Sequence, residues 1–449
     1  MTDTICAPAT APGGALAIIR VSGSQSFPVV STLCSLHCEA LAANTVHFTR
    51  IVSAKGEVLD EVILSIFRAP HSYTGEDSVE ISCHGSRYIL NAVLELLLQN
   101  GCRMANPGEF TMRAYLNGKL DLSQAEAVAD LIASTNEATH HLAMNQLRGG
   151  ISTELSRLRE QLLKLTSLLE LELDFSDHED LEFADRSELL SLAQQTDDHI
   201  IRLAESFHAG NALKNGVPVA IVGAPNVGKS TLLNALLGED RAIVSDIQGT
   251  TRDTIEDTIQ LGGITFRFID TAGIRHTDDT IEQMGIERTY QMIEKSSIVL
   301  WLIDKQPTEE EQREMSERCK DKTLIVVCNK TDKGWGMSNS SLFILHSSFI
   351  AISAKFGIGL DQLRQQLINA APKTSENDII ITNARHYEAL CCAHDCLSRV
   401  LSGIRAGFSG DLIAEDLRLT LTHLAEITGG LITPQETLNS IFSSFCVGK

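Results

Sequence analysis

The chain has 449 residues, of which 43% are hydrophobic and 21% charged, and it carries a formal net charge of −21. This is the composition of a globular protein long enough for about three domains. So acidic a chain is not expected to coat nucleic acid, because phosphate contacts require clustered Lys and Arg, and an RNA substrate would need a partner that supplies basic surface.

Cysteine usage and hydropathy favour a cytoplasmic protein. The 11 cysteines are dispersed and odd in number, and no signal peptide is recognisable, which predicts reduced thiols. Cys391, Cys392 and Cys396 with His394 resemble a metal site, but they lie in a helical pattern and no second cluster completes four ligands, so buried small side chains are favoured over zinc. No apolar run approaches about 18 residues, so we expect no membrane span.

Residues 1–118 are predicted to form an α+β domain. Short runs rich in β-branched and apolar residues predict strands at 15–21, 46–52, 61–67 and 78–83. A helix is predicted over about 86–99. Strands that precede a helix in this way are typical of a separate domain with an antiparallel sheet.

Helical periodicity begins at about residue 119. Steps of three or four residues predict one long helix with a single apolar stripe, with the Gly149-Gly150 pair as the expected site of a kink. The stripe comprises Leu147, Ile151, Leu155, Leu158, Leu162, Leu165 and Leu169. The acidic stretch 170–188 is interpreted as a solvated face or loop.

Residues 223–230 match G-x-x-x-x-G-K-[ST], the P-loop that cradles nucleotide phosphates. An apolar run before the loop predicts a buried strand, and residues 231–237 predict a helix that Gly238 stops at a C′-like position. The loop glycines let successive backbone N–H groups face one anion, and the helix N-terminus adds partial positive charge. Lys229 is expected to reach the β- and γ-phosphates, and Ser230 to ligate Mg²⁺.

Later segments indicate which nucleotide binds. Asp270 follows a predicted strand and suits the outer shell of Mg²⁺, while Thr251 can supply a second hydroxyl to the metal. Asp332, in the segment Asn329-Lys-Thr-Asp332, can accept hydrogen bonds from N1–H and the exocyclic amine of guanine. Adenine has no such donor pair, so GTP is predicted, with residues 353–355 closing over the base.

The predicted GTP contacts occur in the order and rough spacing of a Ras-like GTPase, which residues 216–372 resemble. They are Asn226, Val227, Gly228, Lys229, Ser230, Thr231, Ser245, Asp246, Ile247, Gln248, Gly249, Thr250, Thr251, Asp270, Thr271, Ala272, Gly273, Asn329, Lys330, Asp332, Ser353, Ala354 and Lys355. One position departs, because Ile274 stands where Ras-like enzymes carry a Gln that orients the attacking water. A replacement is expected in the polar stretch 275–288.

Helical periodicity resumes at about residue 384. Asp411 is predicted to cap a helix that ends near Gly429-Gly430, and Thr433-Pro-Gln-Glu436 has the pattern of a capping box for the last helix. The apolar face of that helix comprises Leu438, Ile441, Phe442 and Phe445. We predict that 119–210 and 373–449 pack as one helical domain, with a GTPase domain of residues 211–372 inserted in it.

Together these parts resemble the MnmE (TrmE) family of bacterial tRNA-modification GTPases over the full length of the chain. The motifs that carry the resemblance, besides those of the GTPase, are Ala17-Ile-Ile-Arg-Val-Ser-Gly23, Tyr73-Thr-Gly-Glu-Asp77 with Glu80 and His84-Gly85, Pro107-Gly-Glu-Phe-Thr-Met-Arg-Ala114, Leu116-Asn-Gly-Lys-Leu-Asp-Leu122, Gly285-Ile-Glu-Arg288 and Cys446-Val-Gly-Lys449. The terminal C-x-G-K with an inserted GTPase is specific, whereas a P-loop alone is not.

The resemblance implies a multidomain fold and a reaction. The fold is an N-terminal α+β folate-binding and dimerisation domain, a discontinuous all-α helical domain, and an inserted α/β Ras-like P-loop GTPase domain. The family works as a homodimer with the flavoprotein MnmG, in a heterotetramer, to install an aminomethyl or carboxymethylaminomethyl group at C5 of the wobble uridine (position 34) of certain tRNAs. The one-carbon unit comes from a tetrahydrofolate, either a 5,10-methylene or a 5-formyl derivative. Hydrolysis depends on K⁺ and on dimerisation of the GTPase domains.

The resemblance also implies particular site residues. The folate site would comprise Arg20, Glu80, Lys119 and Lys449, with cations suited to the glutamate tail and the carboxylate to the amino edge of the pterin. The K⁺ ligands would be Asn226, Ser245, Ile247 and Thr250. Glu282 is predicted to orient the attacking water in place of the absent Gln.

Some assignments stay open. An ordinary surface salt bridge is the alternative role for Arg20, and Cys446 has either a structural or a chemical role. Two departures from the family pattern lie near the folate side: Pro12-Gly-Gly-Ala15 lacks an Arg, and His84-Gly-Ser86 replaces His-Gly-Gly. A GTPase switch for ribosome assembly would explain residues 216–372 equally well, but neither the N-terminal domain nor the C-x-G-K terminus. A membrane GTPase of the dynamin type is disfavoured because the chain shows no basic or amphipathic membrane face.

Overall fold

The computed structural model describes most of the chain and divides it into two compact units. The described residues are 3–53, 55–174, 186–238, 257–269, 282–334, 348–373, 375, 378–430, 435–443, 445 and 448. Unit 1 comprises Met1–Ala133, Ala143–Ile201 and Glu388–Lys449, and unit 2 comprises Ser134–Leu142 and Arg202–Tyr387. Helix α7 (Arg186–Asn215) runs unbroken through residues 210 and 211, where the sequence placed a domain boundary.

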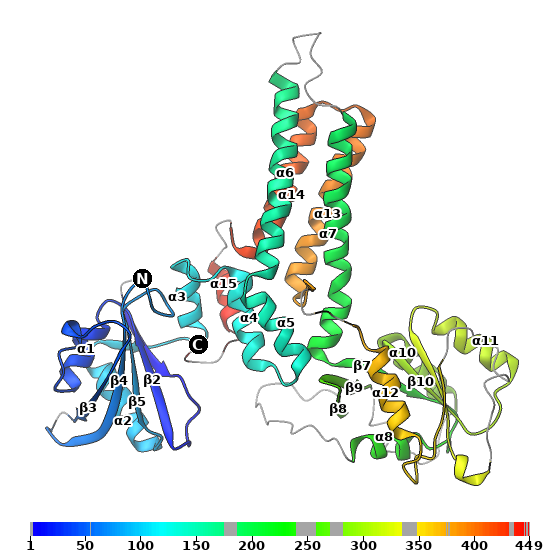
Figure 1. Ribbon diagram of the computed structural model, residues 1–449, viewed down its shortest axis with the longest axis horizontal. Helices are drawn as coiled ribbons and strands as arrows, with labels where there is room; N and C mark the ends of the chain where they lie inside the picture. Colours follow the sequence, from blue (N-terminus) through cyan, green and yellow to red (C-terminus); the bar gives the residue numbers. More distant parts are fainter. Residues whose placement is uncertain are drawn as a thin grey trace. The chain divides into compact units, whose positions relative to one another are not determined.

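A six-stranded sheet forms the N-terminal part of unit 1 (Figure 1), with the strand order β3-β4-β5-β2-β1-β6. The strands are β1 (Thr4–Pro8), β2 (Leu16–Ser22), β3 (Thr45–Val52), β4 (Val58–Phe67), β5 (Ser78–His84) and β6 (Cys102–Met104). Neighbours are antiparallel except β1 and β6, which are parallel. The four predicted strands are present, but the antiparallel prediction is wrong at this edge, where two short strands escaped sequence reasoning.

Helices cover one face of this sheet, and Phe110 packs with Ile5 and Ala7 of β1 on part of the other face. The helical elements are α1 (Ser26–Leu33), the 3₁₀ turn η1 (Cys38–Ala40) and α2 (Arg87–Gln99). Along β5 the side chains of Val79, Ile81 and Cys83 are buried in the core with these helices, whereas Glu80 alternates to the opposite side. Arg20, the cross-strand partner of Glu80, lies on the same face as that carboxylate. The sheet therefore presents both predicted folate residues on the face opposite α1 and α2.

Helix α3 (Glu109–Leu116) is joined to the sheet by a buried ion cluster. The side chain of Arg113 is 1% exposed, and its Nη2 donates to Asp3 Oδ1 at 2.9 Å and to Glu109 Oε1 at 3.0 Å. Its Nη1 donates to Glu76, which precedes β5, at 3.2 Å. Charges this well buried require such partners, so the cluster fixes the loop before β5 against β1 and α3.

Helices make up the remainder of unit 1, and some of them also include residues of unit 2 (Figure 1). They are α4 (Leu122–Ala133), α5 (Glu137–Leu147), α6 (Gly150–Asp174), α7, α13 (Ala384–Ala406), α14 (Gly410–Thr428) and α15 (Gln435–Ser443). The predicted stripe from Ile151 to Leu169 is buried along α6. Leu147 belongs to α5 instead, because Gly149 at φ +84° separates two helices rather than kinking one. Helix α14 packs along α6, and His394 of α13 contacts Asp197 of α7 through a 2.7 Å bond.

At α14, the predicted N-cap is wrong and the predicted helix end is confirmed. Ser409, not Asp411, occupies the N-cap position of α14, so Asp411 falls in the first turn. Gly429 ends the helix at φ +74°, as predicted. The predicted capping box begins at Thr433, outside the described residues, and α15 begins at Gln435, the third residue of that pattern. Leu438, Phe442 and Phe445 pack with Met112, Leu122 and Ala125, and Ile441 lies beside them, which confirms the predicted apolar face.

Unit 2 is built around a mostly parallel sheet with the strand order β12-β11-β10-β7-β9-β8. The strands are β7 (Val217–Val222), β8 (Asp257–Leu261), β9 (Ile264–Phe268), β10 (Ile298–Ile303), β11 (Thr323–Cys328) and β12 (Ser348–Ala351). Only the β8–β9 pairing is antiparallel among the described strands. The other elements are α8 (Lys229–Leu237), α10 (Glu282–Lys295), α11 (Glu309–Arg318), η2 (Thr331–Lys333) and α12 (Leu360–Ala370). Gly238 directly follows α8, as predicted, but as its C-cap residue at φ −68° and not at a C′ position.

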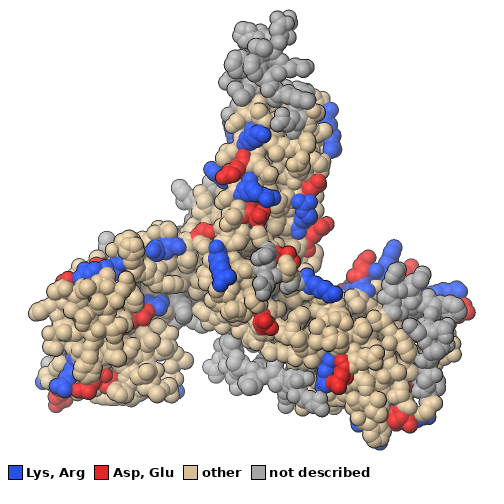
Figure 2. All heavy atoms as spheres, in the orientation of Figure 1, with Lys and Arg blue, Asp and Glu red and all other residues tan. Residues whose placement is uncertain are grey.

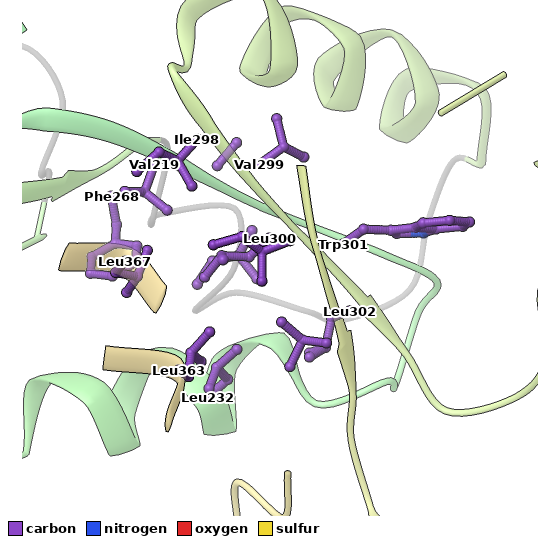
Figure 3. Close-up of a cluster of buried hydrophobic side chains, with 14 of the residues drawn as sticks. Val219, Leu232, Phe268, Ile298, Val299, Leu300, Trp301, Leu302, Leu363 and Leu367 are labelled. Carbon is purple, nitrogen blue, oxygen red and sulfur yellow. The ribbon is translucent and has the colours of Figure 1, made fainter. Parts of the chain in front are cut away.

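The central strand β10 is buried over its whole length, as expected when helices cover both faces of a parallel sheet. Figure 3 shows Leu232 of α8 and Leu363 of α12 on the same side as Leu300 and Leu302 of β10. These side chains are 0% exposed. Their packing fixes the carboxyl end of β7, and with it the start of the P-loop.

No helix in the described part of the chain combines the length and the hydrophobicity needed to span a bilayer.

Candidate functional sites

The P-loop joins β7 to α8 in a conformation that only glycine fits at two positions. Gly223 has φ +151° and Gly228 has φ +105°. A Cβ on Gly223 would lie 2.2 Å from the carbonyl oxygen of Leu302, and one on Gly228 would lie 2.4 Å from Nδ2 of Asn329. The sequence motif is therefore required both by backbone conformation and by close packing.

Lys229 lies at the start of α8 and folds back over the loop. Its Nζ donates to the carbonyl oxygens of Gly223 at 2.8 Å and Ala224 at 2.9 Å. Burial lowers the pKa of the Lys229 ammonium from its ordinary value. Ser230, half-buried, and Thr231, exposed, follow in the first turn of α8. The amino end of this helix thus combines an ammonium group, a hydroxyl and backbone N–H groups, which suits a phosphate chain and its metal.

Asn226 occupies the left-handed region at φ +60° in the exposed part of the loop, a conformation that Asn tolerates better than most residues. Its carbonyl oxygen accepts a 2.8 Å hydrogen bond from Nζ of Lys330. The same Nζ donates to Asp304 Oδ2 at 2.6 Å. Asp304 was missed by sequence reasoning, although its place directly after the buried strand β10 was a usable signal.

The predicted base-recognition segments meet the P-loop. Asn329, 3% exposed, donates from Nδ2 to the carbonyl oxygen of Val227 at 2.9 Å and accepts from the N–H of Ala354 at 3.0 Å. Asp332 Oδ1 accepts a 2.6 Å bond from Ser353 Oγ. Asn329 therefore ties the loop to residues 353–355, and Asp332 carries the carboxylate available to a base. Lys355, the last of these residues, has its Nζ 5.3 Å from the ring of Phe356.

Other predicted nucleotide residues fall outside the described residues. These are Ser245, Asp246, Ile247, Gln248, Gly249, Thr250, Thr251, Asp270, Thr271, Ala272 and Gly273. Glu282 is the first residue of α10, and its side chain is likewise not described. The structure thus brings together three predicted segments, Asn226–Thr231, Asn329–Asp332 and Ser353–Lys355.

A second polar site lies on the face of the N-terminal sheet opposite α1 and α2. Arg20 donates from Nε and Nη2 to Glu80 Oε1 at 2.9 and 2.8 Å, and their side chains are 15% and 24% exposed. The Nη1 of Arg20 also reaches the carbonyl oxygen of Gly448 at 3.4 Å, across 428 residues of sequence. The chain terminus is held closely there, because a Cβ on Gly448 would lie 2.0 Å from the carbonyl oxygen of Pro8. Cys446 and Lys449 lie outside the described residues.

The loop before β5 borders this site. The Arg20 guanidinium carbon lies 5.1 Å from the ring centroid of Tyr73, and burial raises the pKa of that phenol. Lys119 donates from Nζ to the carbonyl oxygen of Pro70 at 3.0 Å and packs beside Gly75. Arg20 is thus paired both with Glu80 and with the chain end, and Lys119 lies along the loop before β5.

Comparison with known proteins decides the family. A family model described as GTP-binding protein TrmE N-terminus matches residues 4–119, and one described as MnmE helical domain matches residues 122–446. The chain is 55% identical to the "tRNA modification GTPase MnmE" of Bacteroides thetaiotaomicron, over 100% of this chain and 99% of that protein. This chain belongs to the MnmE family. The proteins of that name from Porphyromonas gingivalis and Flavobacterium johnsoniae are 50% and 48% identical, again over 100% of this chain and over 98% and 99% of theirs.

Among solved structures, the chain is similar to the G domain of the T. maritima FeoB iron transporter, at 25% identity and a TM-score of 0.27, over 35% of this chain and 99% of that one.

One of the two departures from the MnmE pattern, the Ser in place of the second Gly, has a local explanation. Ser86, where the family usually has a second Gly, is the N-cap residue of α2 at φ −64°, a conformation that does not require glycine. Gly85 does require it, since a Cβ there would lie 1.9 Å from the carbonyl oxygen of Gly14. Asp60 accepts from the N–H of His84 at 2.8 Å and contacts its Nδ1 at 2.7 Å, which fixes the turn. Nothing in the structure explains the missing Arg near Gly14.

The cysteine-rich stretch of α13 has protein partners. His394 Nδ1 contacts Asp197, and Arg399 Nη2 lies 3.2 Å from Cys396 Sγ. In the part of the chain that the structure describes, no group of three or more His, Cys, Asp or Glu residues is placed to hold a metal ion.

Charged side chains are mixed on the face that Figure 2 displays. Lys and Arg are scattered among Asp and Glu there rather than gathered into a broad basic surface. An RNA bound against such a face would depend on shape or on a partner, because a mixed surface neutralises few phosphates.

Proposed function

We propose that the chain is a K⁺-stimulated GTP hydrolase of tRNA modification. With the flavoprotein MnmG it adds an aminomethyl or carboxymethylaminomethyl group at C5 of the wobble uridine of certain tRNAs, using a one-carbon unit from 5,10-methylene- or 5-formyl-tetrahydrofolate. The observation that carries the proposal is the full-length similarity to proteins named tRNA modification GTPase MnmE. The P-loop supports the proposed GTP hydrolysis, and the Arg20–Glu80 site supports the proposed use of a folate.

On the nucleotide side, GTP lies along the P-loop with Lys229 at its phosphates. Ser230 and Thr251 would hold Mg²⁺, which would supply positive charge to the phosphates. Asp332 recognises guanine, and Asn329 keeps the loop and the base segment in register through its bonds to Val227 and Ala354. Glu282 orients the attacking water.

On the folate side, Arg20, Glu80, Lys119 and Lys449 bind the one-carbon carrier. The contact between Arg20 and the Gly448 carbonyl supports this assignment, since it brings the C-x-G-K terminus to the sheet face. Because Arg20 and Glu80 share one hydrogen-bonded pair, a ligand group that binds one of them must also meet the other. Cys446 lies two residues before Gly448 in the sequence, and it has either a structural or a chemical role.

The proposed assembly is a cytoplasmic homodimer through the N-terminal domain, joined by MnmG in a heterotetramer. A formal net charge of −21 disfavours a lone enzyme that grips tRNA by electrostatics. The proposal therefore assigns the basic tRNA-binding surface to the partner.

A deletion strain tests the function directly. Nucleoside analysis of tRNA from a strain lacking this gene should show unmodified wobble uridine, and expression of the full chain should restore the modification. A chain without residues 447–449 should hydrolyse GTP within about twofold of the full chain but restore none of the modification, because Lys449 and the Gly448 contact are lost together.

The controls separate the two halves of the proposal. Lys229→Ala should also fail to restore modification, in this case with loss of hydrolysis. Normal wobble uridine in the deletion strain would instead support a GTPase switch for ribosome assembly. Full restoration by the shortened chain would show that the C-x-G-K terminus has no role in the modification and only ends the last helix.

Potassium dependence gives a second test. A monovalent cation beside the β- and γ-phosphates can do the electrostatic work of an arginine finger, and the neutral amide oxygen of Asn226 suits K⁺. Ser245, Ile247 and Thr250 complete the proposed ligands, and Na⁺ fits the same carbonyl cage poorly. Hydrolysis in K⁺ should exceed that in Na⁺ by at least tenfold.

Substitution at Asn226 should remove this stimulation without harming nucleotide binding. Asn226→Gly deletes the amide while accepting φ +60°, so backbone strain does not confuse the result. Asn226→Asp retains an oxygen ligand at the same backbone and serves as the matched variant, expected to keep K⁺ preference. Equal rates in Na⁺ and K⁺ at matched ionic strength, measured on the unchanged chain, would falsify the role of the ion.

A further inference from the structure

Residues 134–142 are far from the GTPase motifs in sequence but belong to unit 2. They pack against the β8–β9 hairpin of that unit. Ala138 and Leu142 lie against the apolar core that contains β7, β10 and α8. Helix α5 begins in this segment and ends at Leu147, in unit 1, so one helix has its first turns in the GTPase unit and its last turn in the other.

Three hydrogen bonds fasten the segment to the hairpin. Asn136 Nδ2 donates to Thr265 Oγ1 at 2.8 Å, and Gln260 Nε2 donates to the carbonyl oxygen of Thr135 at 2.9 Å. The N–H of Ala138 donates to the carbonyl oxygen of Gly263 at 3.2 Å, in the hairpin turn. A Cβ on Gly263, which has φ +75°, would lie 3.0 Å from Oε2 of Glu137. Backbone, side-chain and turn contacts therefore all fix one register between the hairpin and the helix.

Asn136 also begins α5. Its Oδ1 accepts the N–H of Thr139 at 2.8 Å, which is the N-cap bond, while its Nδ2 holds Thr265. One amide group thus joins the first turn of the helix to β9. A shift of the hairpin that keeps the Asn136–Thr265 bond must therefore either break this cap or move the start of α5.

The hairpin joins the two segments predicted to respond to the γ-phosphate. Strand β8 begins at Asp257, six residues after Thr251, and β9 ends at Phe268, two residues before Asp270. Loops that bind the γ-phosphate and its metal differ in order between the nucleotide states of GTPases. The β8–β9 hairpin is covalently attached to both such loops, so its position is expected to change when their order changes.

We propose that residues 134–142 are the coupling element of the enzyme: Asn136, through Thr265, transmits the nucleotide state from the β8–β9 hairpin to α5, and so to the unit that carries the Arg20–Glu80 site. The inference rests on the proposed function. It assigns Asn136, Gln260 and Thr265 as positioning residues that touch neither nucleotide nor folate. Their role is to make modification depend on GTP, not to carry out hydrolysis.

Thr265→Val tests the proposal in the full chain, because it removes the hydroxyl and keeps a β-branched strand residue. GTP hydrolysis should stay within about twofold of the unchanged chain, while restoration of wobble-uridine modification in the deletion strain falls at least fivefold. Thr258→Val is the matched control. It makes the same change on the same side of the hairpin, and among the described residues no hydrogen bond joins Thr258 to residues 134–142.

Hydrogen exchange supplies the readout that a merely structural contact would not alter. The amides of residues 138–142 should exchange at different rates with GDP and with a non-hydrolysable GTP analogue in the unchanged chain and in Thr258→Val, but at equal rates in Thr265→Val. Gln260→Met removes the second bond and should act in the same direction, which covers the case that Thr265→Val does not fold.

The outcomes separate this inference from the proposed function. Equal exchange with both nucleotides in the unchanged chain overturns the coupling, and so does full restoration of modification by Thr265→Val and Gln260→Met. Absence of GTP hydrolysis or of modification by the unchanged chain overturns the proposed function instead, while the exchange measurement still decides whether the hairpin and α5 respond together.

Discussion

Replacement of Glu282 by alanine is expected to slow GTP hydrolysis by about 10²–10⁴-fold, the range for loss of a positioned acid–base group. Nucleotide affinity should change by less than about threefold, because no contact to the base or the P-loop is assigned to this residue. Single-turnover hydrolysis and equilibrium binding of a fluorescent GTP analogue measure the two quantities separately.

Two features of the chain support this role for Glu282: the absence of the water-orienting Gln and the position at which α10 begins. Ile274 replaces the water-orienting Gln of Ras-like enzymes and has no group that can hold water. Glu282 is the first residue of α10, and the amino end of a helix stabilises a negative charge. An ionised carboxylate at that position can accept a proton from water or orient it through a second water.

Glu310→Ala is the matched control for Glu282→Ala. Glu310 lies exposed in the first turn of α11 in the same unit, so it tests the loss of one acidic residue at a helix start. The control should hydrolyse GTP at the rate of the unchanged chain. If Glu282→Ala does the same, Glu282 is a surface carboxylate and the water must be held by another residue.

The GTPase sheet was predictable because its strands are short apolar runs bounded by motif residues. Strand β8, Asp257–Leu261, was not predicted, since only two of its five residues are buried and its sequence alternates with polar residues. Strands β1 and β6 were missed for a related reason: one ends at Pro8 and the other has three residues, so neither has a period long enough to recognise.

Long-range contacts were the part of the sites that residue patterns could not supply. The pairing of Arg20 with Glu80 and the approach of Gly448 depend on strand register and on where the last helix ends. The contact of Asn136 with Thr265 spans 129 residues and involves side chains with no motif of their own. By contrast, Asn329 was found by its motif, but its role is now seen as tying the P-loop to Ala354.

Asp332→Asn is expected to weaken GTP binding by about 10²-fold and to move preference toward xanthosine triphosphate. Hydrogen bonds to a charged group contribute about 1.5–3 kcal/mol each, and about 1.4 kcal/mol corresponds to tenfold in affinity. Ser353 Oγ donates to Oδ1 of Asp332 at 2.6 Å, and an amide oxygen can accept that bond equally well. The amide nitrogen then takes the place of the other carboxylate oxygen, so a donor meets the exocyclic amine of guanine, whereas the corresponding carbonyl of xanthine accepts from it.

Competition binding with GTP, ATP and xanthosine triphosphate measures this change in base preference. Asp361→Asn makes the same chemical change at a side chain that is 98% exposed in the first turn of α12, and it should leave all three affinities unaltered. Because Ser353 remains bonded in either variant, the loop 353–355 should keep its position, and the effect should appear in the base preference and not in folding stability. Unchanged GTP affinity in Asp332→Asn would show that the carboxylate does not read the base, and the assignment of GTP over ATP would then have to rest on other residues.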